Sequence, residues 1–155
     1  MKINCYNIRK NKETKQPELI KEKTVSCESS VISNPSEIYE FLKSALDVTT
    51  YYEEKLYAIA LNTAGKVIGI FEVSTGSSRA ALASPKAIFS RLIMVQAEAF
   101  ILTHNHPSGL TKPSRNDIEF TNKLSKIGEM MEINLLDHII TGENSYFSFK
   151  NEGMM

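Results

Sequence analysis

The stretch from residue 97 to residue 117, AEAFILTHNHPSGLTKPSRND, decides how this chain is expected to fold. Its apolar first part, 97–103, predicts a buried strand that leads directly to His104. The following loop, 105–113, contains two prolines and a glycine, and Ser114 is a typical helix cap that predicts a helix from residue 115. A strand, a loop and a helix in this order form the repeating unit of an α/β fold.

Outside this stretch, two more helices are predicted by start signals of the same kind. Asn34 before Pro35 and Ser84 before Pro85 each place a capping side chain ahead of a proline, which fits the first helical position. Apolar residues at helical spacing continue these helices to about residues 47 and 95. Apolar runs bounded by turn residues predict strands at 3–8, 19–25, 57–61, 67–73, 133–141 and 146–149. The order of these elements predicts an α/β domain in which about three helices flank one central sheet of mixed strand direction.

Length and composition are those of an ordinary globular domain. The chain has 155 residues, of which 42% are hydrophobic and 23% charged, enough for one buried core. We expect residues 1–33 to form a β-extension packed on the same domain, and residues 34–150 to form the domain itself. No stretch reaches transmembrane length and no apolar signal segment opens the chain, so we expect no membrane association. Cys5 and Cys27 stand alone, which predicts reduced thiols in a cytoplasmic protein.

The net charge of the chain is zero, but the charge is unevenly distributed. Residues 1–23 carry seven basic and three acidic side chains, a net charge of +4, which leaves −4 for the remainder. A total of zero gives the whole protein no strong electrostatic attraction to nucleic acid or to an anionic membrane. The basic segment has two interpretations, an arm that contacts nucleic acid or an edge hairpin guarded by lysines, and we favour the second.

A metal site is predicted where the strand meets the following helix. His104 and His106 are two of the three histidines of the chain, and in an extended segment residues i and i+2 project to the same side. Asp117 falls in the first turn of the next helix, and two imidazoles with one carboxylate can bind a catalytic zinc ion while leaving a fourth position for water. The alternative is that Ser114 and Asp117 only form a capping box and that the histidines only bond loop groups. The two interpretations are compatible, since Ser114 can cap while Asp117 faces the metal.

Two further residues are candidates for supporting roles. Glu72 is the best candidate for the proton acceptor of a hydrolytic zinc site, because it shares strand parity with Ile68 and Ile70 and is directed where apolar neighbours go. The alternative for Glu72 is an edge position where that face meets solvent. His138 follows Asp137 on an apolar strand, and we expect either a core histidine or one that contacts a metal ligand.

The runs 104–109 (HNHPSG) and 113–117 (PSRND) closely resemble the JAB/MPN-type (JAMM) metallopeptidase-like domain of the bacterial RadC group. Segments 61–63, 72–76, 84–85 and 136–138 are similar to that group as well. The resemblance implies a three-layer, mixed-sheet JAB/MPN fold, which is cytidine-deaminase-like. It implies zinc ligation by His104, His106 and Asp117, general acid/base catalysis by Glu72 and oxyanion stabilisation by Ser114. Longer RadC proteins also carry an N-terminal helix-hairpin-helix domain, for which this chain has no room, so we expect a short form.

The expected function is that of a zinc-dependent hydrolase of amide bonds, in a peptide or an isopeptide, with a peptide or protein as substrate. Two alternatives stay open: a DNA-repair-associated accessory protein that contacts nucleic acid, and a metal-binding interaction module without turnover. The ligand set also suits non-haem iron, but the carboxylate of Glu72 and the resemblance favour zinc. Zinc deaminases are excluded because the H-x-E and P-C-x-x-C elements are absent. The sequence specifies neither a cleavage site nor an oligomeric state.

Overall fold

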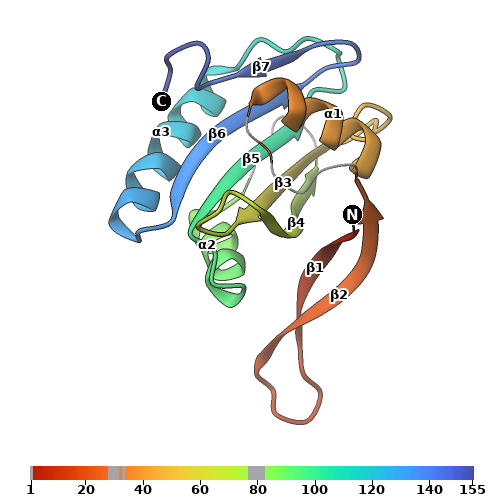
Figure 1. Ribbon diagram of the computed structural model, residues 1–155, viewed down its shortest axis with the longest axis vertical. Coiled ribbons are helices and arrows are strands. Elements are labelled where there is room, and N and C mark those ends of the chain that lie inside the picture. Colours follow the sequence, from red (N-terminus) through yellow and green to blue (C-terminus); the bar gives the residue numbers. More distant parts are fainter. Residues whose placement is uncertain (1, 28–31, 33, 77–82) are drawn as a thin grey trace.

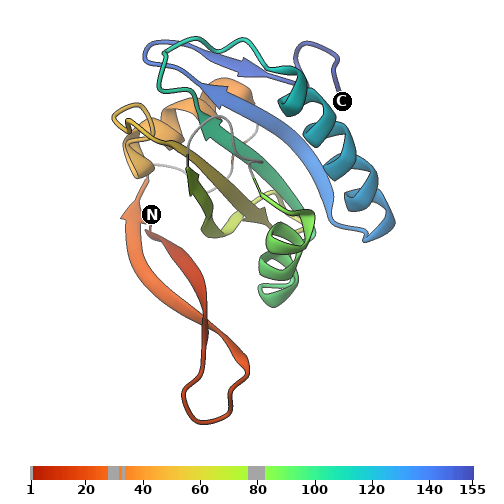
Figure 2. The same ribbon diagram turned by 180° about the vertical axis from the view of Figure 1, so that it is seen from behind.

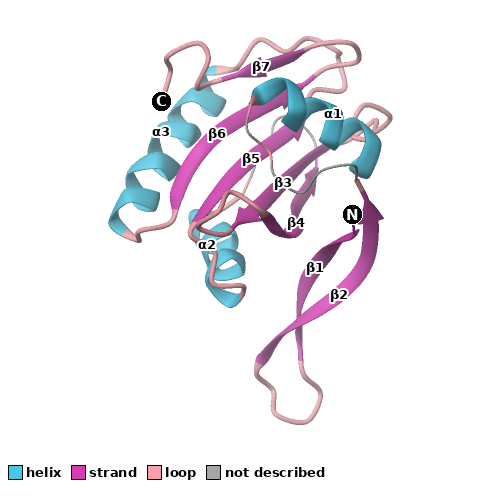
Figure 3. Ribbon diagram, in the orientation of Figure 1, coloured by secondary structure: helices cyan, strands magenta, loops and turns pink. Residues whose placement is uncertain are grey.

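The computed structural model describes residues 2–27, 32, 34–76 and 83–155. Its strands form one seven-stranded mixed sheet (Figures 1 and 3). The strand order is β2-β1-β4-β3-β5-β6-β7. The pairs β1–β4 and β5–β6 are parallel and the other neighbours are antiparallel. The strands are β1 (Lys2–Lys10), β2 (Pro17–Ser26), β3 (Glu54–Leu61), β4 (Val67–Gly76), β5 (Ala99–Asn105), β6 (Asn134–Thr141) and β7 (Tyr146–Ser148).

The three described helices begin where the sequence predicts. They are α1 (Pro35–Leu46), α2 (Pro85–Met94) and α3 (Arg115–Met130). The side chains of Asn34, Ser84 and Ser114 each accept a hydrogen bond from the backbone N–H three residues later, which satisfies a donor that the first turn leaves unpaired. Among the described residues, no helix combines the length and the apolar character needed to cross a membrane.

The helices cover the two faces of the sheet, which gives a three-layer α/β architecture and confirms the predicted fold class. Strand β3 shows the division, because its side chains alternate between two hydrophobic cores. Tyr57, Ile59 and Leu61 pack in the core beneath α1. Leu56, Ala58 and Ala60 pack in the core beneath α2 and α3. Figure 2 shows α2 and α3 from their own side of the sheet, with α1 behind it.

Pairing between distant strands extends two of the predicted elements. Strand β3 begins at Glu54 instead of residue 57, because it pairs antiparallel with β5 and Leu56 lies opposite His104. The Asn105 side chain accepts a hydrogen bond from Lys55 N–H at 2.8 Å and so holds the start of β3 in place. Consequently β5 continues to Asn105, and His104 lies inside the strand instead of after it.

The first two strands form a hairpin that projects from the rest of the molecule (Figures 1 and 2). Its base joins the domain: Cys5 and Tyr6 pair with β4, while Ile3, Cys5 and Val25 enter the core beneath α1. Further along the hairpin, Leu19 packs against the core beneath α2 and α3. Strand β2 is an edge strand, as the lysine-rich sequence predicts. The site described below lies at a different part of the molecule, at the carboxyl end of β5.

Candidate metal centre

His104 and His106 bring two ring nitrogens together at the end of β5. His104 is the penultimate residue of β5, and His106 is the first residue after the strand. Because the two residues are two positions apart in extended chain, their side chains project to one side, and their Nε2 atoms lie 3.0 Å apart. His104 is fully buried and His106 is partly exposed. The Nδ1 atom of His106 lies 2.7 Å from the backbone oxygen of Leu110. Because a carbonyl oxygen only accepts, Nδ1 carries the proton in neutral His106 and Nε2 presents a lone pair.

Asp117 joins the two histidines from the first turn of α3. Its Oδ1 atom lies 3.5 Å from His104 Nε2, and its Oδ2 atom lies 3.7 Å from His106 Nε2. Oδ2 also accepts hydrogen bonds from the Ser114 hydroxyl at 2.6 Å and from Ser114 N–H at 2.7 Å. The predicted capping box is therefore present, and the same carboxylate faces the imidazoles. Since the Ser114 proton is held by Asp117, the oxyanion role of Ser114 stays a prediction.

A carboxylate that sequence reasoning missed completes the group. Glu54, the first residue of β3, places Oε1 3.9 Å from His104 Nε2. One ligand atom from each of Glu54, His104, His106 and Asp117 lies within 4.8 Å of the others. Two nitrogens and two oxygens therefore converge from β3, β5, the loop after β5 and α3.

Strand register explains why Glu54 reaches the histidines. Residues directly opposite on paired strands project to the same face of a sheet. Leu56 lies opposite His104, and Glu54 is two residues before Leu56, so Glu54 faces the same side. In the sequence, Glu54 shares a period-two pattern with Leu56 and Ala58, which places the three side chains on one face of a strand. This pattern does not specify that the strand pairs with the one that carries His104.

Glu72 does not lie in this group, which corrects its expected place in the site. It lies opposite Tyr57, whose side chain packs beneath α1, on the face of the sheet away from His104. The shared parity with Ile70 is real, but Ile68 packs on the other face because the β3–β4 register shifts between residues 60 and 61. Parity alone thus directed Glu72 to the wrong face.

The surroundings of Glu72 stabilise its charge instead of making it a base. Its carboxylate accepts hydrogen bonds from Thr75 at 2.7 Å, Tyr57 at 3.2 Å and Lys55 at 3.3 Å, and 42% of the side chain is exposed. Partial burial acts to raise the pKa of Glu72, but the bonds from Thr75, Lys55 and Tyr57 outweigh it and hold the pKa below its usual value. A carboxylate of this kind is a weak proton acceptor.

The pKa values of the four converging groups are driven apart. Burial lowers the pKa of His104 to about 4, against the opposing effect of Asp117. The neighbouring Asp117 carboxylate raises the pKa of His106. Burial acts to raise the pKa of Asp117, but His106, His104 and Ser114 together hold it far below its usual value. Burial raises the pKa of Glu54, with Asp117 adding to the effect against the opposing His106. Titratable pairs pushed apart in this way are typical of functional sites.

The donor set and its spacing fit a divalent metal ion. At a tetrahedral zinc with bonds of 2.0–2.1 Å, neighbouring ligand atoms are separated by about 3.3 Å. The separations from His104 Nε2 to His106 Nε2 and to Asp117 Oδ1, 3.0 and 3.5 Å, bracket this value. Two imidazole nitrogens with carboxylate oxygens suit zinc and also non-haem iron. The geometry of these four residues therefore fits a metal site.

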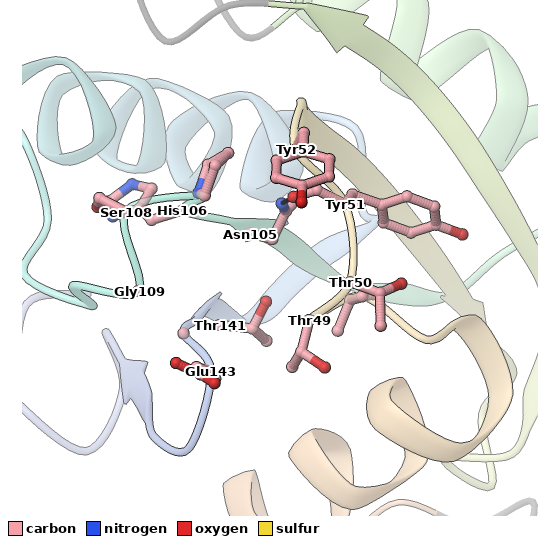
Figure 4. A pocket seen from close by; sticks show the side chains of 13 residues that line it. Thr49, Thr50, Tyr51, Tyr52, Asn105, His106, Ser108, Gly109, Thr141 and Glu143 are labelled. Carbon is pink, nitrogen blue, oxygen red and sulfur yellow. Dashed lines mark hydrogen bonds between the residues drawn. The ribbon is translucent and has the colours of Figure 1, made fainter.

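His106, a member of the group, also lines a cavity of about 260 Å³ (Figure 4). Its walls come from three segments, residues 48–52 after α1, residues 105–109 after β5 and residues 141–143 after β6. Figure 4 shows the side chain of Thr49 across the cavity from His106. The ligand group is thus adjacent to a space that can receive part of another molecule.

His138 lies behind His104, fully buried on β6, with its Nε2 2.9 Å from His104 Nδ1. Its position agrees with both parts of the expectation, a core histidine that also contacts a candidate ligand. The metal group and its support therefore involve all three histidines of the chain.

Comparison with known proteins identifies relatives across most of the chain. The model of the RadC-like JAB domain family matches residues 32–154. A UPF0758 protein of Clostridium acetobutylicum is 39% identical over 130 residues, 84% of this chain and 56% of that protein. A UPF0758 protein of Carboxydothermus hydrogenoformans is 40% identical over 119 residues, 77% of this chain and 52% of that protein. The chain thus spans about half the length of these curated relatives, and the match to the family model begins after the β1–β2 hairpin.

Proposed function

This chain belongs to the RadC-like JAB domain family, and on that premise we propose that it is a zinc-dependent hydrolase of amide bonds, in peptides or isopeptides. The observation that carries the proposal is the convergence of Glu54, His104, His106 and Asp117 within 4.8 Å. A group that offers two nitrogens, two carboxylates and an adjacent cavity has the parts that metal-assisted hydrolysis requires.

The four residues divide into metal ligands and a proton acceptor. His104, His106 and Asp117 would hold the metal, because both imidazoles face the Asp117 carboxylate and each lies within 3.7 Å of it. Bound there, zinc would lower the pKa of a water molecule to about 7 and polarise the scissile carbonyl. Glu54 Oε1 lies 3.9 Å from His104 Nε2, and Glu54 is the carboxylate left over once the three ligands are assigned.

Glu54 then takes the acid/base role for which Glu72 was the sequence candidate. Its side chain is largely buried and burial raises its pKa, so it binds a proton more readily than an exposed glutamate. We infer that Glu54 accepts a proton from the attacking water and donates it to the leaving amine. A carboxylate with such a role favours hydrolysis, and hence zinc, over the redox chemistry of non-haem iron.

The cavity beside His106 would receive the substrate. Its lining by residues 48–52, 105–109 and 141–143 places it at the carboxyl end of β5 and β6, where open α/β sheets usually bind ligands. A peptide or protein chain that enters this cavity brings a carbonyl group next to His106. Ser114 is the candidate to stabilise the oxyanion, once its hydroxyl is released from Asp117.

The test is turnover of peptide and isopeptide libraries by the full chain loaded with zinc. We expect Glu54→Gln to reduce turnover by about a hundred- to ten-thousand-fold, the range for a general acid/base, without abolishing zinc binding. Glu72→Gln is the matched control and is expected to retain turnover. Equal activity of Glu54→Gln and the unaltered chain would remove Glu54 from its role. No amide cleavage by protein with one zinc per chain would favour a metal-binding interaction module instead.

A second candidate function, contact with nucleic acid, rests on the β1–β2 hairpin. The hairpin region carries the net charge of +4 in residues 1–23, projects from the domain and precedes the segment that the family model matches (Figure 1). A salt-dependent shift of a DNA duplex by the full chain would support it, and Lys12→Glu with Lys15→Glu should then weaken the shift. Binding that is indifferent to salt and to both substitutions would count against this function.

A further inference from the structure

His138 connects the candidate ligand His104 to a side chain of α3. Its Nε2 atom lies 2.9 Å from His104 Nδ1, and its Nδ1 atom lies 2.6 Å from the hydroxyl oxygen of Thr121. The Thr121 hydroxyl in turn lies 2.6 Å from the backbone oxygen of Asp117. All three side chains are buried, and the His138 ring stacks on Phe149 with 9° between the planes. The three contacts form an unbranched chain from the ligand to the backbone.

The end of this chain fixes the direction of every hydrogen bond in it. A backbone carbonyl only accepts, so the single proton of the Thr121 hydroxyl points to Asp117. Thr121 must then accept from His138, whose Nδ1 carries the proton, and the unprotonated Nε2 of His138 accepts from His104 Nδ1. The Nε2 atom of neutral His104 is left with a lone pair that faces Asp117 Oδ1.

The opposite direction is unfavourable at the Thr121 end and incompatible with metal binding at the His104 end. It would place two acceptor oxygens, those of Thr121 and of the Asp117 carbonyl, 2.6 Å apart with no proton between them. It would also put a proton on His104 Nε2, where it would point into the group of candidate ligands and block metal binding.

We propose that Thr121 and His138 are positioning residues that set the tautomer of His104 and direct its Nε2 lone pair to the metal. This inference rests on the metal ligands of the proposed function, not on its hydrolytic step. His106 needs no such chain, because the Leu110 carbonyl fixes its tautomer directly at 2.7 Å. His104 lies inside β5 and directs its Nδ1 toward β6, so a side chain must supply the acceptor that the loop backbone supplies to His106.

The chain of contacts also couples the two ligands to one turn of helix. Asp117 offers its carboxylate to the imidazoles and its backbone oxygen to Thr121, one turn later in α3. A displacement of this turn changes the carboxylate position and the support of His104 together. With both tautomers fixed, the Nε2 atoms of His104 and His106 face each other as acceptors at 3.0 Å, beside two carboxylates. Such a set of acceptors is stabilised by a shared cation.

The first test is long-range ¹H–¹⁵N NMR of the metal-free full chain at pH 7.5, labelled at its three histidines. We expect His104 and His138 both to carry their proton on Nδ1 and to leave Nε2 unprotonated. A proton on Nε2 of His104 would overturn the proposal. This measurement is independent of catalysis. A protein without hydrolytic activity can still have the predicted tautomers, and an active hydrolase can lack them, so the tautomer proposal and the proposed function fail separately.

The second test is zinc affinity, measured by competition with a chromophoric chelator. Contacts that orient a metal ligand typically contribute ten- to hundred-fold in affinity, so we expect Thr121→Val to weaken zinc binding by about that factor. Thr121→Ser retains the hydroxyl and should restore affinity to within about threefold, an estimate that allows for the lost methyl contact.

Thr103→Val provides the matched control. Thr103 is buried next to His104, and its hydroxyl has no hydrogen-bond partner within the described part of the chain. The control should therefore bind zinc like the unaltered protein. Equal zinc affinities of Thr121→Val and Thr103→Val would overturn the positioning role, as would affinity lost in Thr121→Ser. Unfolding midpoints of the three variants identify any that fail to fold, and in that case the tautomers of the unaltered chain decide.

Discussion

Gly142 is the position at which the support of the candidate site is predicted to be most sensitive to a single methyl group. A Cβ atom at residue 142 would lie 2.4 Å from the backbone oxygen of Gly109 and 2.9 Å from Cγ2 of Thr111. Real Cβ atoms essentially never approach other atoms closer than 3.0 Å, so Gly142→Ala requires a movement of at least 0.6 Å. Backbone atoms must make this movement, because the closest contact is a carbonyl group.

The displaced loop is the one that fixes His106. Gly109 N–H donates to the backbone oxygen of His106 at 2.9 Å, and the next carbonyl, that of Leu110, accepts from the His106 ring. Overpacking of this kind typically costs 1–3 kcal/mol, so we expect Gly142→Ala to lower the free energy of unfolding by about that amount. We also expect zinc affinity to fall by about tenfold or more, because a contact that orients a ligand is disturbed.

The assay is urea denaturation of the metal-free chain together with zinc titration. Gly76→Ala is the matched control, because a Cβ there meets no atom of the described residues within 4 Å and its φ angle is not in the left-handed region. The control should change the free energy of unfolding by no more than about 0.5 kcal/mol and leave zinc affinity unchanged. If Gly142→Ala matched the control in both measurements, the loop would not be held by this contact.

Three further predictions concern the ligands and their charges. Asp117→Asn should weaken zinc binding by more than about a hundredfold in a calorimetric titration, since even groups that only orient ligands contribute up to that factor, and unchanged affinity would exclude Asp117 as a ligand. Ser114→Ala removes two hydrogen bonds of its hydroxyl, the cap that accepts from Asp117 N–H and the bond donated to Asp117 Oδ2, so urea denaturation should show a loss of about 1 kcal/mol, whereas no loss would contradict the capping role. Burial lowers the pKa of His104 from 6.5 to about 4. Between these pH values His104 is therefore protonated in the unfolded chain but neutral in the folded chain. The unfolding free energy of the metal-free protein should therefore fall from pH 6.5 to pH 4, with His104 contributing about 3 kcal/mol and His138 adding to the loss, while the raised pKa values of His106 and Glu54 oppose it. Denaturation at several pH values measures this slope, and stability that rises toward pH 4 would contradict it.

Features encoded within a few residues could be predicted from the sequence. The helix caps Asn34, Ser84 and Ser114 act on backbone groups three residues away, so their sequence signals suffice. His104 and His106 face one side because a strand alternates with period two, and Asp117 reaches them through a short loop. The resemblance of these same segments to one family also indicated the layered architecture correctly.

Features that depend on strand register could not be predicted in this way. Glu54 belongs to the site because Leu56 lies opposite His104, a pairing between residues far apart in the sequence. Glu72 carries the same kind of pattern, but its partner Tyr57 places it on the other face. Period-two alternation separates the two faces of a strand without saying which face holds the site. The roles of Thr121 and His138 also required the coordinates, since α3 and β6 meet only in the folded chain.

The central claim is that His104, His106 and Asp117 bind one metal ion while Glu54 remains beside it as the proton acceptor. The most direct test is a crystal structure of the zinc-loaded protein with anomalous scattering measured at the zinc edge. We predict one peak about 2.0–2.1 Å from Nε2 of both histidines and from an oxygen of Asp117, with the Glu54 carboxylate beyond bonding distance. A zinc peak coordinated by Glu54 in place of Asp117, or no peak at this site under saturating zinc, would contradict the claim.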